Sequence, residues 1–204
     1  MKYLKYFKTD VECQNYFSSG DFVTPNVSYV EDTNIVYYSP GDEIIMTSES
    51  NPEVMKVCHN QGWAASSDKM YASEAATVTS IGTAFESLGN EGSASGYSGS
   101  NMSFTFSFDE FKYFTGVTSI VDGAFQESNI VSITIPDSVT SIGDYAFGNC
   151  SELKEITCLA TTAPSITGHT FSNIRQYGFL KAPAGSNYSS WIKNLGPYRW
   201  VTQQ

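Results

Sequence analysis

Apolar residues in the middle of the chain recur in one phrase at a fixed spacing. Val117-Thr-Ser-Ile120 returns as Val139-Thr-Ser-Ile142, and Ala124-Phe125 returns as Ala146-Phe147, in each case 22 residues later. Ile130-x-x-Ile133 returns after 23 residues as Leu153-x-x-Ile156. A repeat of this length predicts stacked coils, because one unit buries its apolar edge only against the next unit.

The series of coils extends beyond these two copies in both directions. Val78–Phe85 repeats the phrase with one residue fewer, and Phe171 occupies the place of Phe125 and Phe147. A small Ala precedes the Phe in both full coils, which predicts one shared aromatic stack. Residues 89–102 are rich in Gly and Ser and predict an exposed, mobile excursion. Residues 104–114 then predict an aromatic-rich strand that returns to the core.

A stack of coils needs a cap where it ends, and residues 160–204 have the composition of one. Ala163-Pro164 ends the last regular coil. The alternative for this Trp-containing tail, a membrane anchor, is disfavoured because the tail is short and only lightly basic. The apolar residues expected to cover the open edge are Leu180, Tyr188, Trp191, Ile192, Leu195 and Trp200.

The first 77 residues do not share the repeat. Apolar spacing over 1–20 predicts an amphipathic helix, and Val27–Val30 with Ile35–Tyr38 predicts a β-hairpin, with 43–47 as a possible third strand. A helix is predicted over 52–58 with its cap near Asn51, and a second one over 70–76. We therefore expect an α+β, mainly β chain with three parts: an attachment or oligomerisation segment (1–50), a helical connector (51–77) and a solenoid with its cap (78–204).

Composition excludes some classes of partner. Eleven basic and 21 acidic residues give a net charge of −10, which repels nucleic-acid phosphates and anionic membranes. No signal peptide is visible and no apolar stretch is long enough to cross a bilayer. The leader was therefore removed, or the protein reaches its destination without secretion. Four cysteines lack metal-site spacing, and we expect buried thiols, with a Cys150–Cys158 disulfide as the alternative.

No residue pattern indicates a catalytic or cofactor site. Nucleophile-elbow, zinc-protease, P-loop and dinucleotide motifs are absent from the sequence. His59 follows Cys58, but adjacent residues on a helix face different ways, and His169 lies in an expected surface turn. We expect no cofactor and no metal, and an enzyme acting on carbohydrate ranks third among the functions considered.

Residues 133–156, IPDSVTSIGDYAFGNCSELKEI with the two residues before it, resemble the unit of the BspA-like leucine-rich repeats. The match covers Pro136, Gly143 and Cys150 as well as the apolar positions. Leu180-Lys-Ala-Pro183 and the residues after it resemble the ending of that family. The sequence DEFKYFTGVTSI, preceded by the early VTSIGTAF, looks like versions of this repeat encoded by gut Bacteroidales and their phages. The resemblance is specific over 111–190 and implies a non-catalytic domain for surface recognition or adhesion.

Members of this family often carry an EF-hand-like loop before the repeats. Here the corresponding segment, 63–74, retains only Asp68 and Glu74 as carboxylates, and Asp68 replaces the Gly of the turn. A calcium loop needs several oxygen ligands around that turn. We therefore expect a degenerate loop that serves as a helical connector.

Two functions from different classes remain. The first is a virion surface component of a phage, a fibre or decoration protein, whose residues 1–50 form a homo-oligomer or join the particle. The second is a bacterial cell-surface adhesin. In both, the partner is a protein or a surface glycan. The side chains expected to bind it alternate with core residues along the repeat strands and form one polar ladder: Ser132, Thr134, Glu155 and Thr157.

Overall fold

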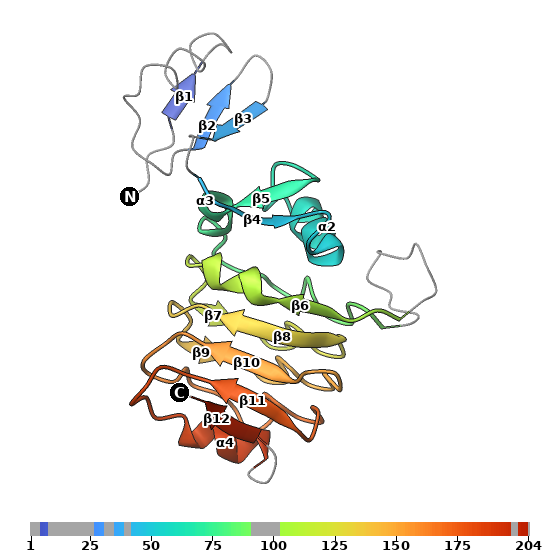
Figure 1. Ribbon diagram of the computed structural model, residues 1–204, viewed down its shortest axis with the longest axis vertical. Helices are drawn as coiled ribbons and strands as arrows, with labels where there is room; N and C mark the ends of the chain where they lie inside the picture. Colours follow the sequence, from blue (N-terminus) through green and yellow to red (C-terminus); the bar gives the residue numbers. More distant parts are fainter. Residues whose placement is uncertain are drawn as a thin grey trace.

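The computed structural model describes residues 42–90, 103–196 and 200–203, together with three short strands, 5–7, 27–30 and 35–38, of which only the backbone is considered. The described chain is mainly β, and its largest sheet has five parallel strands in the order β12-β11-β10-β8-β6. Figure 1 shows these strands lying side by side as successive coils of a short solenoid. The strands are β6 (Phe106–Phe108), β8 (Ile130–Ile135), β10 (Glu155–Cys158), β11 (Gly178–Lys181) and β12 (Trp200–Gln203).

The repeat spacing in the sequence becomes the register of the sheet. Ile156 pairs with Ile133 on one side and with Leu180 on the other, and all three side chains are fully buried. Ser119–Ile120 (β7) and Ser141–Ile142 (β9) form a second, two-stranded parallel sheet behind the first. Identical steps along the chain therefore place identical side chains one above another.

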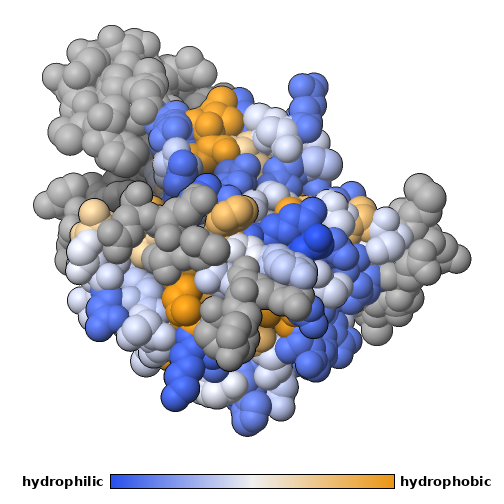
Figure 2. Space-filling view, turned by 60° about the horizontal axis from the view of Figure 1, so that its bottom comes forward, coloured by the Kyte–Doolittle hydropathy of each residue, from blue (hydrophilic) through white to orange (hydrophobic). Residues whose placement is uncertain are grey.

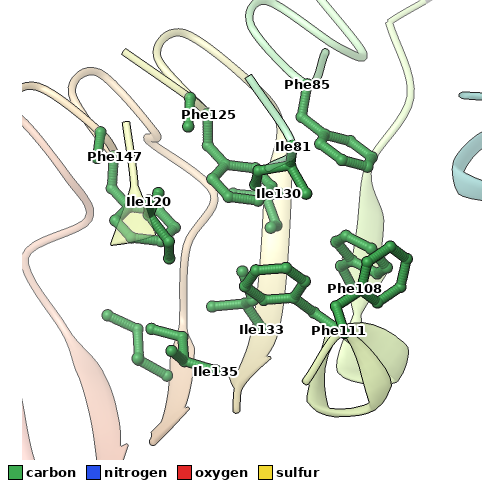
Figure 3. Close-up of a cluster of buried hydrophobic side chains, with 14 of the residues drawn as sticks. Ile81, Phe85, Phe108, Phe111, Ile120, Phe125, Ile130, Ile133, Ile135 and Phe147 are labelled. Atoms are coloured by element: carbon green, nitrogen blue, oxygen red, sulfur yellow. The ribbon is translucent and has the colours of Figure 1, made fainter. Parts of the chain in front are cut away.

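One ring from each coil enters a continuous aromatic stack, as the sequence predicted (Figure 3). Phe125 stacks on Phe147 with ring centroids 5.1 Å apart and an interplanar angle of 2°. Phe85 stacks on Phe125 at 5.2 Å, and Phe147 stacks on Phe171 at 5.5 Å. The shortened first copy of the phrase is therefore a real coil of the solenoid. Figure 3 also shows the Ile side chains of β8 packed beside these rings.

The second residue after each stacked Phe has a left-handed backbone. Ser87, Glu127, Asn149 and Asn173 have φ between 54° and 61°. In the first three of these residues the backbone N–H donates to a carbonyl oxygen of the next coil, at 2.7–2.8 Å. The left-handed turn aims that N–H along the stack and links one coil to the next.

The connector joins the solenoid to a small sheet. Ile44–Thr47 (β4) pairs antiparallel with Lys69–Tyr71 (β5), so this sheet crosses the boundary expected at residue 50. The helix Pro52–Asn60 (α2) begins where predicted, but the Asn51 side chain does not cap it and instead donates to the Ser107 carbonyl at 2.8 Å. The helix predicted over 70–76 is wrong at its first two residues, which belong to β5, and the helix Ala72–Ala75 (α3) begins directly after them.

Glu74, the last residue of the degenerate EF-hand-like segment, holds the connector together. Its carboxylate oxygens accept the backbone N–H groups of Ala65 at 2.7 Å and Tyr71 at 2.8 Å, and the side chain is buried. Both oxygens of the carboxylate that would bind calcium in an EF-hand therefore accept backbone hydrogen bonds.

The N-terminal prediction is partly wrong. Lys5–Phe7 forms a strand (β1) parallel to Val27–Val30 (β2), where the sequence predicted helix. The hairpin of β2 with Ile35–Tyr38 (β3) is confirmed. The remainder of the predicted 1–20 helix and most of the Gly- and Ser-rich excursion lie outside the described residues. A 3₁₀ helix, Asp109–Tyr113, replaces the second half of the strand predicted over 104–114.

The expected cap is present at the last coil. Helix Ser189–Leu195 (α4) buries Trp191 and Leu195. The Trp191 ring lies 5.4 Å from Phe171 at an angle of 55°, so it closes the stack with a tilted ring. Trp191 Nε1 and the Tyr188 hydroxyl donate to the carbonyls of Pro164 and Ala160, at 2.9 and 2.7 Å.

Three cysteines are buried as free thiols. They are Cys58, Cys150 and Cys158, so the alternative Cys150–Cys158 disulfide is not formed. Cys150 occupies the slot of Ser128 one coil later, 3.7 Å from its hydroxyl, and its thiol contacts the Phe125 carbonyl oxygen at 3.0 Å. Burial raises the pKa of the Cys150 thiol to about 12. Cys13 lies outside the described residues.

Candidate functional site

One face of the five-stranded sheet carries the side chains that alternate with the core residues along each strand. We call this surface the outer face. In one row, Ser107, Ser132, Glu155 and Phe179 occupy paired positions on β6, β8, β10 and β11. In the next row Thr134, Thr157 and Lys181 occupy paired positions on β8, β10 and β11. Neighbouring strands lie about 4.8 Å apart, so each row is a closely spaced line of side chains.

The register places the four predicted binding residues side by side. Ser132 pairs with Glu155 and Thr134 pairs with Thr157, and all four side chains are half-buried. The ladder inferred from alternation is therefore a continuous surface. That a ligand binds there remains a prediction.

Asp109 anchors the first end of this surface. Its carboxylate accepts the Ser132 hydroxyl at 3.1 and 3.2 Å and the Thr134 hydroxyl at 3.4 Å. These hydroxyls are therefore oriented by the protein, because each already donates its one proton to the carboxylate. The two hydroxyl oxygens can still accept hydrogen bonds from a ligand.

The other end of the outer face differs in chemistry. Lys181 Nζ lies 2.7 Å from Glu155 Oε1, and both side chains are roughly one-third to two-fifths exposed. Beside them Phe179 has 44% of its surface exposed. Phe179, Lys181 and Asp109 were missed by sequence reasoning. β11 lacks the repeat phrase and was assigned wholly to the cap, and Asp109 is the first residue of a 3₁₀ helix where the sequence predicted a strand.

A pocket of about 460 Å³ lies where the connector meets the first strand, next to Asp109. Asn51 and Glu53 of the α2 N-terminus and Glu110 are among the residues that line it. Burial raises the pKa of the Glu110 carboxyl, against the effect of the hydrogen bond that Asn51 Nδ2 donates to it at 3.2 Å. Among the described residues, no group of His, Cys, Asp and Glu is arranged to hold a metal ion.

The two histidines lie away from the outer face. His59 Nδ1 is 3.3 Å from the Ala64 carbonyl oxygen at the end of α2. His169 stacks on Tyr145 with ring centroids 5.2 Å apart, and its Nδ1 lies 3.3 Å from Asp144. Thr167 donates to the same Asp144 oxygen at 2.5 Å. The Asp144 carboxylate thus accepts the Thr167 hydroxyl and lies beside the His169 ring, which links two successive turns of the solenoid.

Comparisons with known proteins agree with this architecture. A family model described as "BspA type Leucine rich repeat region" matches residues 100–189 in six copies. Neither the curated proteins nor the solved structures compared with the chain gave a match. In the part of the chain that the structure describes, no helix is long and apolar enough to cross a membrane. Leucine-rich-repeat solenoids are typically non-enzymatic folds that bind proteins or surfaces. Residues 100–189, which include β6, β8, β10 and β11, belong to the BspA-type leucine-rich repeat family.

Proposed function

We propose that the protein is a non-enzymatic recognition component of a phage particle, a fibre or decoration protein that presents its solenoid to a host or matrix glycan. In this proposal residues 1–50 join the particle or form a homo-oligomer. The observation that carries it is that the two ends of the described chain are built differently. Trp191 closes the last coil, while the β1–β2–β3 sheet lies at the opposite end in Figure 1.

The outer face is the surface that remains for recognition. It consists of hydroxyl, carboxylate, ammonium and aromatic groups held at strand spacing, and most of those described make a hydrogen bond within the protein. A rigid surface loses little side-chain entropy when it binds. This supports a binding role for the solenoid.

A bacterial cell-surface adhesin is the second candidate, and the BspA-type repeat match favours it. Both candidates use the same outer face and differ in what lies at the other end of the molecule. Neighbouring capsid and portal genes would support the phage particle. A lipoprotein signal encoded upstream in the same reading frame would support the adhesin.

Native mass spectrometry of the full chain tests the assembly, and a glycan array with immobilised matrix proteins tests the recognition. We expect an oligomer and binding to at least one surface ligand. A strict monomer at micromolar concentration would refute assembly through residues 1–50. Turnover of a polysaccharide that disappears on substitution of a carboxylate would replace both candidates with an enzyme.

A further inference from the structure

Four side chains of β10 and β11 occupy the corners of a four-sided patch on the outer face. Glu155 pairs with Phe179, and Thr157 pairs with Lys181. The Lys181–Glu155 contact at 2.7 Å runs along one diagonal. The Phe179 ring and the Thr157 hydroxyl therefore occupy the two opposite corners. We refer to these four residues as the β10–β11 subsite.

We propose that the β10–β11 subsite binds a neutral glycan, with one sugar ring lying on Phe179. This rests on the proposed function and specifies the ligand class and the position. The apolar C–H face of a sugar covers an aromatic ring, while its hydroxyl groups need donors and acceptors at the rim. The other three residues of the patch supply a carboxylate, an ammonium and a hydroxyl beside the ring.

The exposure of Phe179 is built into the fold. Gly178 pairs with Trp200, and a Cβ at Gly178 would lie 2.7 Å from the Trp200 ring and 2.6 Å from the Lys154 carbonyl oxygen. Trp200 is buried, and its Nε1 donates to the Arg175 carbonyl at 3.0 Å. Trp200 and the buried Leu180 fix β11 from the inner side, so Phe179 lies on the outer side, where 44% of its surface is exposed.

Charge at the subsite favours an uncharged ligand. Glu155 and Lys181 neutralise each other, and the whole chain carries a net charge of −10. A polyanionic glycan would be repelled by the protein as a whole. A cationic group would have to displace Lys181 from its carboxylate. A neutral sugar keeps the ion pair and hydrogen-bonds to its remaining lone pairs and protons.

The size of the apolar area favours a sugar over a protein partner. Stable protein interfaces bury about 1,200–2,000 Å² around a cluster of apolar anchors. Within the paired rows of β10 and β11 the exposed large apolar residue is Phe179, and its row continues with Glu155 and Ser132. The exposed Tyr177 and Leu159 lie just beyond the ends of β11 and β10. In the view of Figure 2 the described surface is mostly hydrophilic, with hydrophobic residues in small separate patches. A few apolar groups set among polar ones suit the small apolar face of a sugar better than a protein interface.

Affinity electrophoresis of the full chain tests the proposal. The native gels contain mannan, galactomannan, dextran or xylan as neutral polysaccharides, and polygalacturonate or heparin as acidic ones. We expect retardation by at least one neutral polysaccharide. Phe179→Ala should weaken it at least tenfold, because the ring loses its contact with the sugar. Phe179→Tyr, which keeps a ring, should retain binding.

The control removes a ring of similar exposure from elsewhere. Tyr145 is 41% exposed on the turn side of the solenoid and has φ of 52°, which Asn tolerates, so Tyr145→Asn should bind as the wild type does. Retardation by acidic polysaccharide alone, or by none, would overturn the proposal. So would neutral-glycan binding that survives Phe179→Ala, and in that case recognition by the protein would stand while the subsite would not. Binding to matrix protein alone would identify a protein partner instead.

Discussion

The aromatic stack should couple adjacent coils energetically, and a double-mutant cycle on Phe125 and Phe147 measures that coupling. Both rings are fully buried, and they lie parallel at 5.1 Å. Replacing either Phe by Leu keeps an apolar side chain of comparable size and removes the ring contact. A stacked aromatic pair contributes about 0.5–1.5 kcal/mol beyond the area that it buries. We therefore expect a coupling energy of roughly 0.5–1.5 kcal/mol between these positions.

The single variants should cost more than this coupling. Phe147 contacts a ring on each side, Phe125 and Phe171, so Phe147→Leu loses two pairs, about 1–3 kcal/mol in total. Urea unfolding followed by tryptophan fluorescence and by circular dichroism gives each free energy of unfolding. Coincident transitions and unchanged m-values are needed for the comparison.

The matched control is the pair Phe85 and Phe171, which lie at opposite ends of the stack and share no stacked ring. Their effects should add within about 0.3–0.5 kcal/mol. A coupling energy of zero between Phe125 and Phe147 would refute the stack as a link between coils. Equal coupling in both pairs would show that the Leu variants act on the whole solenoid rather than through ring contact.

Three further predictions follow from the contacts described above. Glu74→Gln should lower the free energy of unfolding by about 1.5–3 kcal/mol, because an amide cannot accept both backbone N–H groups that Glu74 accepts. Addition of 5 mM CaCl₂ should leave the melting temperature of the wild type unchanged. A rise of several degrees would show that the segment binds calcium after all. Glu127→Asn should raise the free energy of unfolding by about 0.5–1 kcal/mol, since Glu127 is left-handed where Asn149 and Asn173 stand in later coils, whereas Gln126→Asn should give no gain. The raised pKa of Cys150 stabilises the folded protein fully below the unfolded thiol pKa near 9, and this contribution is lost as pH rises toward 12. Relative to Cys150→Ser, the wild type should lose about 1 kcal/mol of unfolding free energy between pH 9 and 10, and parallel pH profiles would contradict this.

The repeat was predictable because its signal is periodic and local. The offset of 22 places Phe125 on Phe147, and strand alternation places Ser132 and Thr134 outward, both without knowledge of the rest of the chain. The pairing of β4 with β5 was not predictable, because residues 44 and 71 are far apart in the sequence and neither strand repeats. Phe179 was missed for a related reason, since β11 continues the sheet without the phrase that identifies a coil.

The helix predicted at the N-terminus shows the limit of spacing as a signal. Leu4 and Phe7 fit a helical stripe, but the short apolar run that contains Phe7 fits a strand equally well, and β1 pairs in parallel with β2. Short apolar runs do not distinguish the two periods. Asn51 gives a second example: its position before Pro52 predicted a cap, but its side chain reaches the first repeat strand instead.

The stack ends in tilted rings at both limits, Trp191 at 55° to Phe171 and Trp63 at 37° to Phe85. A tilted ring presents its edge rather than its face, so a further ring cannot stack on it in parallel. The ends therefore act as fixed terminals, and the interior coils between them as interchangeable spacers. Duplicating one interior unit would lengthen the molecule by one strand spacing, about 4.8 Å, and leave both terminals intact. The number of coils thus serves as a ruler that sets how far the cap stands from the N-terminal sheet.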